Sequence, residues 1–324
     1  MEYGLFDFLK LIGSLGVFLY GMKLMSEALQ KVAGERMRHI LSAMTSNRVK
    51  GVITGILITA IIQSSSATTV MVVSFVNAGL LSLVESIGVI MGANVGTTVT
   101  AWLISILGFK VSMAEISLPM IGLCLPLLFS NKRSRKNWGE LIIGFGLLFI
   151  GLEFLKNSMP NLDENPEMFT FLQEYADMGY ASYILFMLIG TVLTILIQSS
   201  SATMALTLVM CANGWINFEI AASMVLGENI GTTVTANLAA MVANSTAKRA
   251  AFAHFLFNVF GVIWVLSIFP LFLGWIEALS VAMGIGNPET SVEAVPMALS
   301  LFHTAFNISN VLIPVSYTHL TLPT

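Results

Sequence analysis

Two identical strings of small polar residues interrupt this otherwise apolar sequence. The string QSSSAT occupies residues 63–68 and returns, 135 residues later, at 198–203. Serine hydroxyls can donate hydrogen bonds to oxyanions, and the side-chain oxygens of glutamine and threonine are hard ligands that suit small cations. Such a string in apolar sequence predicts an ion-binding site, and its recurrence predicts two copies of that site.

A second polar motif follows each string at the same distance. It reads GANVGTTVTA at residues 92–101 and GENIGTTVTA at residues 227–236. Two long motifs that recur in register indicate an internal duplication. Small residues also let membrane helices pack closely, and for any single residue this alternative stays open. The duplicated pair of motifs as a whole favours the ion-binding interpretation.

The composition points to a membrane protein and away from an enzyme. Of the 324 residues, 56% are hydrophobic and 10% are charged, whereas roughly a quarter are charged in an ordinary globular protein. The sequence contains no GxxxxGK[ST], HExxH or GxSxG motif, so we expect no enzymatic activity. Cys124 and Cys211 lie in apolar segments and predict neither a disulfide framework nor a transition-metal site.

The length of the segments that carry the motifs predicts how they enter the membrane. A single helix over residues 51–81 would be roughly 45 Å long, which exceeds a hydrocarbon core of about 30 Å. As a re-entrant hairpin, each arm would reach about 20 Å, so the serines would lie near the membrane centre. We therefore expect re-entrant helical hairpins at 51–81 and 181–213. We also expect discontinuous transmembrane helices at 83–108 and 218–243, unwound at their central glycines and asparagine.

Charged segments predict the orientation of the chain. Basic stretches at 31–50, 132–136 and 248–249 alternate with acidic stretches at 158–180 and 277–293. Basic loops face the cytoplasm, so the N-terminus is expected outside and both hairpins are expected to enter and leave on one side. The predicted fold class is therefore an all-α polytopic membrane protein with two inverted-topology repeats. Each repeat has a re-entrant helical hairpin and a discontinuous transmembrane helix.

The predicted organisation has three parts. Repeat 1 covers residues 1–135, repeat 2 with the closing helices covers 136–315, and an atypical tail covers 316–324. The tail is threonine-rich, and we interpret it as a cloning remnant or as the mark of a truncated chain. Ordinary full spans are predicted at about 5–29, 113–129, 139–157, from 250 to about 275, and 296–314.

Inverted repeats whose discontinuous helices meet at the membrane midplane are the architecture of secondary transporters. Exposed helix N-termini suit an anion, and unwound carbonyl groups suit a small cation. Neither motif contains Lys or Arg. A bound anion would therefore depend on helix dipoles and on cations that bind with it, which would couple the two fluxes.

The paired QSSSAT strings, each followed by G(A/E)N(V/I)GTTVTA, resemble the bacterial branch of the type II sodium/phosphate cotransporter family. The resemblance covers residues 5–315. It implies sodium-coupled uptake of inorganic phosphate by alternating access in the bacterial cytoplasmic membrane, with phosphate held between the hairpin tips and no cofactor besides Na+. The residues implied for phosphate binding are Gln63, Ser64, Ser65, Ser66, Gln198, Ser199, Ser200 and Ser201. The residues implied for sodium binding or for lining the cavity are Thr68, Asn94, Thr97, Thr98, Thr203, Glu228, Asn229, Thr232 and Thr233.

The expected partners are inorganic phosphate, sodium ions and the lipid bilayer, and no nucleic acid. A homo-oligomer and a separate protein resembling the phosphate-uptake regulator are further candidates. Two other functions remain open. One is a sodium-coupled carrier of another oxyanion, because hydroxyl and amide donors do not by themselves distinguish phosphate from sulfate. The other is a membrane module that senses phosphate without transporting it.

Two further features break or echo the repeat. Glu228 stands where the first motif has Ala93, and a carboxyl group inside a membrane is costly. Our hypothesis is that it adds negative charge to a cation site or titrates with substrate; the alternative is a wet or polar environment. The pattern H-x-x-F-N occurs at 254–258 and at 303–307. Its spacing places His and Asn on one helix face, for an interhelical hydrogen bond or for support of the discontinuous helices.

Overall fold

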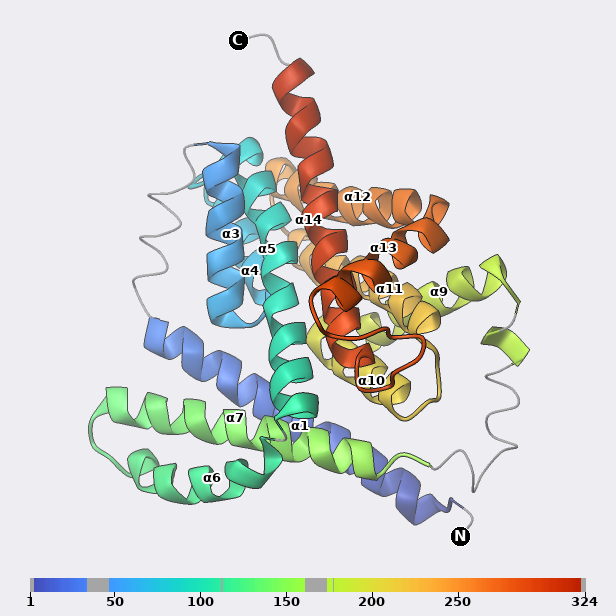
Figure 1. Cartoon of the computed structure of the whole chain (residues 1–324). Coiled ribbons are helices and arrows are strands. Elements are labelled where there is room, and N and C mark those ends of the chain that lie inside the picture. The colour runs from blue at the N-terminus through green and yellow to red at the C-terminus, as the bar shows by residue number, and fades with distance from the viewer. Residues whose placement is uncertain (1–2, 34–46, 112, 161–173, 177, 322–324) are drawn as a thin grey trace.

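The computed structural model describes residues 3–33, 47–111, 113–160, 174–176 and 178–321, with 314–321 as backbone only. All the regular secondary structure of this part of the chain is helical, as predicted (Figure 1). Six of its helices are long and apolar enough to cross a membrane, which supports a multi-pass membrane protein. The centre of the predicted basic stretch 31–50, most of the acidic stretch 158–180, and the last three residues of the tail lie outside the described residues.

The helices follow the duplication. The first half contains α1 (Leu5–Ala33), α3 (Arg48–Ile62), α4 (Ser65–Asn77), α5 (Leu83–Leu103), the π-helical η1 (Ile104–Lys110) and α6 (Ala114–Leu128). The second half contains α7 (Arg133–Asn157), α9 (Tyr180–Ile197), α10 (Ser200–Ala212), α11 (Phe218–Ala240), α12 (Ser245–Ser267), α13 (Phe269–Ala282) and α14 (Val295–Thr321). Side chains from α10, α11 and α14 contribute much of the main buried apolar cluster.

Each QSSSAT string divides its segment into two helices at the same backbone conformation. Gln63 ends α3 with φ 58° and ψ 28°, and Gln198 ends α9 with φ 57° and ψ 27°. This left-handed conformation is uncommon for a residue with a Cβ atom and reverses the chain direction. Ser64 and Ser199 then begin α4 and α10 as N-caps. The helix–turn–helix parts of both predicted hairpins are therefore present.

The predicted break in the next helix is wrong in both halves. α5 continues through Gly92 and Gly96, and α11 continues through Gly227 and Gly231. Without water, every backbone group in a membrane must be paired, and an unbroken helix pairs them internally. The glycines serve close packing instead. A Cβ atom on Gly92 would lie 2.0 Å from the carbonyl oxygen of Val52 on α3.

The same close packing occurs in the second half. A Cβ atom on Gly227 would lie 1.9 Å from the carbonyl oxygen of Met187 on α9. These two residues follow Gly92 and Val52 by the repeat distance. The duplicated sequence therefore builds the same helix pair twice, α3 with α5 and α9 with α11. For these glycines, the packing interpretation of the second motif is correct.

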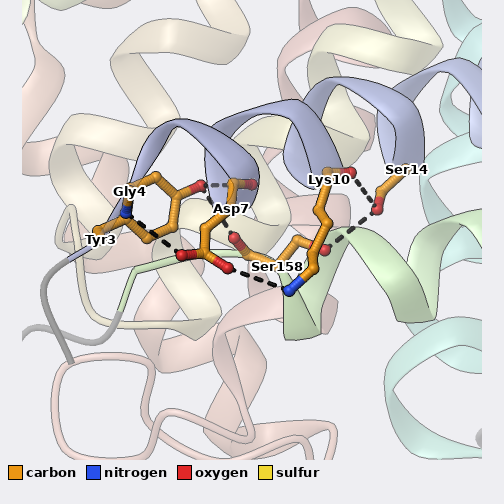
Figure 2. A network of polar contacts seen from close by, with 6 residues as sticks. All are labelled: Tyr3, Gly4, Asp7, Lys10, Ser14 and Ser158. Carbon is orange, nitrogen blue, oxygen red and sulfur yellow. Dashed lines mark hydrogen bonds and ion pairs between the residues drawn. The ribbon is translucent and has the colours of Figure 1, made fainter.

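Helices α1 and α7 also pack backbone to backbone (Figure 1). Cβ atoms on Gly21 of α1 and on Gly151 of α7 would lie 2.3 Å from the backbone nitrogens of Leu148 and Phe18. Figure 2 shows how the start of α1 is joined to Ser158, the residue after α7. The Ser14 and Ser158 hydroxyls lie 3.1 Å apart, and the Ser158 carbonyl accepts from the Tyr3 hydroxyl at 3.1 Å.

One predicted span is two helices. The segment expected to run to about Trp275 ends as α12 at Ser267, and α13 begins at Phe269. Pro270 lies in the first turn of α13, where its missing N–H is tolerated and its ring prevents the preceding helix from continuing. As a result, Glu277 belongs to α13, so its placement in an acidic loop was wrong.

Candidate functional site

Both hairpin turns line one cavity of about 390 Å³. One face of α1 forms the third side of the cavity. The lining residues on this face are Leu19, Met22, Lys23, Ser26, Glu27 and Gln30. The hairpin turns contribute residues 63–66 from the first half and 197–201 from the second. All eight residues predicted for phosphate binding are therefore brought together around this cavity, although they come from segments 135 residues apart.

The serines of each turn have two different tasks. The Ser64 hydroxyl accepts from the backbone N–H of Ala67 at 3.2 Å, and that of Ser199 accepts from Ala202 at 3.3 Å. These two hydroxyls cap helices. The following serines have uncommitted hydroxyls, with no hydrogen bond to any described residue, and they are Ser65, Ser66, Ser200 and Ser201. Four hydroxyls that line the cavity are thus free for a ligand.

The backbone of the two turns adds donors of the same kind. The N–H groups in the first turn of a helix have no partner within that helix, and the helix dipole places positive partial charge there. α4 begins at Ser65 and α10 begins at Ser200, and both starts lie at the cavity. Two helix N-termini with free serine hydroxyls form a site whose chemistry suits an oxyanion.

The two glutamines are not equivalent. The Gln63 Oε1 atom accepts from the Thr100 hydroxyl at 3.0 Å, its Nε2 donates to the Ala60 carbonyl at 2.5 Å, and the side chain is buried. Gln198 is exposed in the cavity and makes no side-chain hydrogen bond to the described residues. Gln63 therefore braces its turn, whereas Gln198 can contact a ligand.

This asymmetry yields a paired prediction. Gln198→Ala should weaken the binding of an anion in the cavity and leave thermal stability unchanged, because the Gln198 side chain has no partner to lose. Gln63→Ala should lower the free energy of unfolding by about 1 kcal/mol or more, since it leaves the buried Thr100 hydroxyl without its acceptor. Thermal unfolding of both variants and anion binding to both variants test the assignment. Equal losses of stability would contradict it.

Two charged residues at the cavity were missed by the sequence analysis. Lys23 and Glu27 lie on the α1 face, with Nζ and Oε1 3.9 Å apart and side chains 72% and 49% exposed. The available signal was the spacing of polar residues at 23, 26, 27 and 30, which places them on one face of an apolar helix. Ser26 on the same face donates to the Ile62 carbonyl at 2.8 Å, which ties α1 to the first turn.

The residues predicted for sodium binding do not line this cavity. Their threonines share one arrangement, in which the hydroxyl donates to a carbonyl three or four residues earlier in the same helix or at its cap. These are Thr68, Thr97, Thr98, Thr203, Thr232 and Thr233. Each such hydroxyl oxygen keeps lone pairs that could accept from a donor or contact a cation. All six are buried.

Asn94 belongs to a network between α5 and α12. Its Nδ2 donates to Asn258 Oδ1 at 2.9 Å, and its Oδ1 lies 3.1 Å from His254 Nε2. Because an amide oxygen only accepts, Nε2 is the protonated nitrogen in this arrangement. The first H-x-x-F-N pattern therefore makes the interhelical hydrogen bonds predicted for it.

The second H-x-x-F-N pattern is different. Asn307 donates to the carbonyl of His303 on its own helix at 2.9 Å, and its Oδ1 has no partner among the described residues. Asn229, the counterpart of Asn94, donates to Val225 on its own helix at 2.8 Å. The network that joins α5 to α12 is therefore not repeated between α11 and α14.

These features define a class of protein. A multi-pass helical protein with a polar cavity between two equivalent helix–turn–helix units is a membrane transporter rather than an enzyme. The chain belongs to the Na+/Pi-cotransporter family, which it matches over residues 17–157 and 171–287. This membership confirms the resemblance drawn from the paired motifs and supports phosphate transport, and the family description names sodium beside phosphate.

Relatives fall into three groups. YqeW of Bacillus subtilis (strain 168) is 34% identical over 266 residues, which are 81% of this chain and 83% of YqeW. The Escherichia coli (strain K12) protein named "Putative inorganic phosphate export protein YjbB" is 32% identical over 260 residues, 80% of this chain but 46% of that protein. The rat sodium-dependent phosphate transport protein 2A is 39% identical over 101 residues, 30% of this chain and 16% of that protein. No solved structure matches the chain.

Proposed function

We propose that this protein is a secondary active transporter that couples the uptake of inorganic phosphate to sodium by alternating access. The observation that carries the proposal is the cavity in which two helix N-termini present four uncommitted serine hydroxyls. Phosphate would lie between the two turns, held by these hydroxyls, by the first-turn N–H groups and by Gln198. The proposed location is the bacterial cytoplasmic membrane, with the N-terminus outside.

Charge balance supports the coupling. Among the described residues that line the cavity, only Lys23 and Glu27 are charged, and they offset each other. A phosphate anion there would have its charge balanced by helix dipoles and by bound sodium. Buried hydroxyl and carbonyl oxygens behind the turns, including those of Thr68 and Thr203, are the proposed sodium ligands. Binding of either ion would then favour binding of the other.

Re-entrant hairpins in two halves of opposite orientation are part of the proposal. Equal backbone conformations at Gln63 and Gln198 support a shared origin of the halves. Movement of the turns against the α1 face would open the cavity to either side. Sodium enters cells down its gradient, so a coupled symporter would take phosphate inward. The printed name of YjbB says export, so the direction of phosphate transport is one of the quantities that the uptake experiment must measure.

The test is uptake of labelled phosphate into proteoliposomes that contain the purified protein. An inward sodium gradient should drive accumulation, and a potassium gradient should not. Excess unlabelled sulfate or arsenate tests the choice of anion. Sodium-dependent binding without accumulation would favour a sensor, and accumulation of sulfate instead would reassign the anion. An outward sodium gradient should drive efflux of preloaded phosphate, since a symporter is reversible.

Lys23 provides a second prediction about the same cavity. Lys23→Gln should raise the KM for phosphate by about 1.4- to 5-fold, as expected for an exposed charge worth about 0.2–1 kcal/mol. The effect should shrink in high concentrations of an impermeant salt, because salt screens exposed charges. Lys10→Gln is the matched control, since Lys10 lies on the same helix but pairs with Asp7 away from the cavity (Figure 2). Equal effects of the two variants would rule out a local role for Lys23.

A further inference from the structure

A buried carboxyl group lies at the contact between α10 and α11. Glu228 on α11 is 1% exposed, and its Oε1 lies 2.9 Å from the Thr207 hydroxyl on α10. Its Oε2 has no hydrogen-bond partner among the described residues. No described Lys, Arg or His forms an ion pair with it. An ionised carboxylate without a countercharge is strongly disfavoured in such surroundings.

The hydrogen bonds around Thr207 indicate where a proton lies. The Thr207 hydroxyl has one proton and two oxygens within reach, the Thr203 carbonyl at 3.0 Å and Glu228 Oε1 at 2.9 Å. A protonated carboxyl group satisfies both contacts. Its Oε1–H donates to the Thr207 oxygen, and the Thr207 hydroxyl donates to the Thr203 carbonyl. An ionised carboxylate would have to share this single hydroxyl proton with the carbonyl.

The duplication contains a natural control for this pair. The positions equivalent to Thr207 and Glu228 in the first half are Val72 and Ala93, and both are fully buried. The two polar residues are thus absent together from the first half. Because the first half packs with the apolar pair, the polar pair is not a requirement of this helix arrangement.

The carboxyl group is joined to the cavity by hydrogen bonds along α10. Thr207 bonds to the carbonyl of Thr203, and the Thr203 hydroxyl donates to the carbonyl of Ser199 at 3.1 Å. Ser199 caps α10 and lines the cavity. A change in charge at Glu228 would therefore act on the helix that holds the second turn.

We propose that Glu228, together with Thr207, forms a proton-binding site, and that its proton is coupled to transport through the second turn. The coupling rests on the proposed function, whereas the site itself does not. On release, the Oε1–H bond breaks, the carboxylate keeps the electron pair and the proton passes to water. A transition-metal ion is a poorer match, since no cluster of three or more His, Cys, Asp or Glu side chains occurs in the described chain.

Other titratable groups lie on the helices that pack against α11. α4 has none, α10 has the buried Cys211, and α14 has the buried His303. α9 has Tyr180 and Tyr183 at its start, with Tyr183 bonded to Glu219. α12 has the exposed Lys248 and Arg249 and the buried His254, which bonds to Asn94. None of them forms a hydrogen bond or an ion pair with Glu228.

Infrared spectroscopy of the purified full chain tests the site without requiring transport. The wild-type protein should show the carbonyl stretch of a protonated carboxyl group at neutral pH, and Glu228→Gln should lose it. A spectrum without that band, or one in which the band survives in Glu228→Gln, would overturn the site.

Uptake measurements test the coupling. The ratio of variant to wild-type uptake at each pH cancels the titration of phosphate itself. For Glu228→Gln and for Thr207→Val with Glu228→Ala, this ratio should change at least several-fold across the pH range. The double variant copies the apolar pair of the first half and is expected to fold. A ratio that stays constant with pH for both variants would overturn the coupling. Absence of phosphate uptake by the wild-type protein would instead count against the proposed function.

Discussion

Sodium-dependent phosphate uptake is expected to fall at least ~100-fold when Ser65 and Ser200 are both replaced by alanine. A hydrogen bond to a charged ligand contributes about 1.5–3 kcal/mol, and the double variant removes one from each turn. Both hydroxyls line the cavity and have no hydrogen bond to the described protein. The loss should therefore appear in kcat/KM and leave thermal stability near that of the wild type.

The control for this experiment lies on the same helix as Ser65. Ser74 is exposed on α4 and donates to the Val70 carbonyl at 2.8 Å, outside the cavity. Ser74→Ala should transport phosphate like the wild type. Single replacements of Ser65 and Ser200 should each weaken uptake by about ten-fold or more, because the two turns present equivalent donors. Full activity of the double variant would exclude the turns as the phosphate site.

Replacing Gly92 by valine is expected to have the largest effect on stability. A Cβ atom at Gly92 would lie 2.0 Å from the Val52 carbonyl oxygen, on the backbone of α3. Backbone cannot move aside as a flexible side chain can, so α3 and α5 would have to separate. We expect a loss of at least ~4 kcal/mol, in the range seen only for severe core disruption. Gly227→Val should do the same to α9 and α11, where the corresponding distance is 1.9 Å.

Thermal unfolding in detergent and the yield of monodisperse protein measure this effect. Gly122→Val on α6 is the control, because a Cβ atom there would meet nothing within 4 Å. The result also separates two roles for the second motif. A loss of stability in Gly92→Val identifies a packing glycine. Normal stability of Gly92→Val would contradict the packing role.

Local chemistry made much of this protein predictable. Apolar composition requires a membrane-embedded helical fold, and the duplicated strings mark equivalent elements wherever they lie. The turn at each QSSSAT string follows from residues that cap helices well, since Ser64 and Ser199 accept from the N–H groups of the following turn. The family also follows from these motifs, which are long enough to be specific.

Other features depend on neighbours that the sequence does not identify. Gly92 is flexible in isolation, yet its helix stays continuous because α3 packs against it and a membrane leaves no water for unpaired backbone groups. Whether Gln63 stabilises its turn or contacts a ligand depends on Thr100, which lies 37 residues further along the chain and donates to it. Gln198, the equivalent glutamine of the second half, has no such donor among the described residues.

The sequence alone thus determined the membrane class, the duplication, the two turns and the family, because each of these follows from composition or from contiguous residues. Only the tertiary structure decided that the two turns share one cavity, that Lys23 and Glu27 of α1 lie beside it, and that the second motif packs helices. The physical reason is that the cavity forms between two turns more than a hundred residues apart in the sequence. The close helix crossings form where the backbones of two helices meet. Residue type and local spacing do not encode which segments will meet.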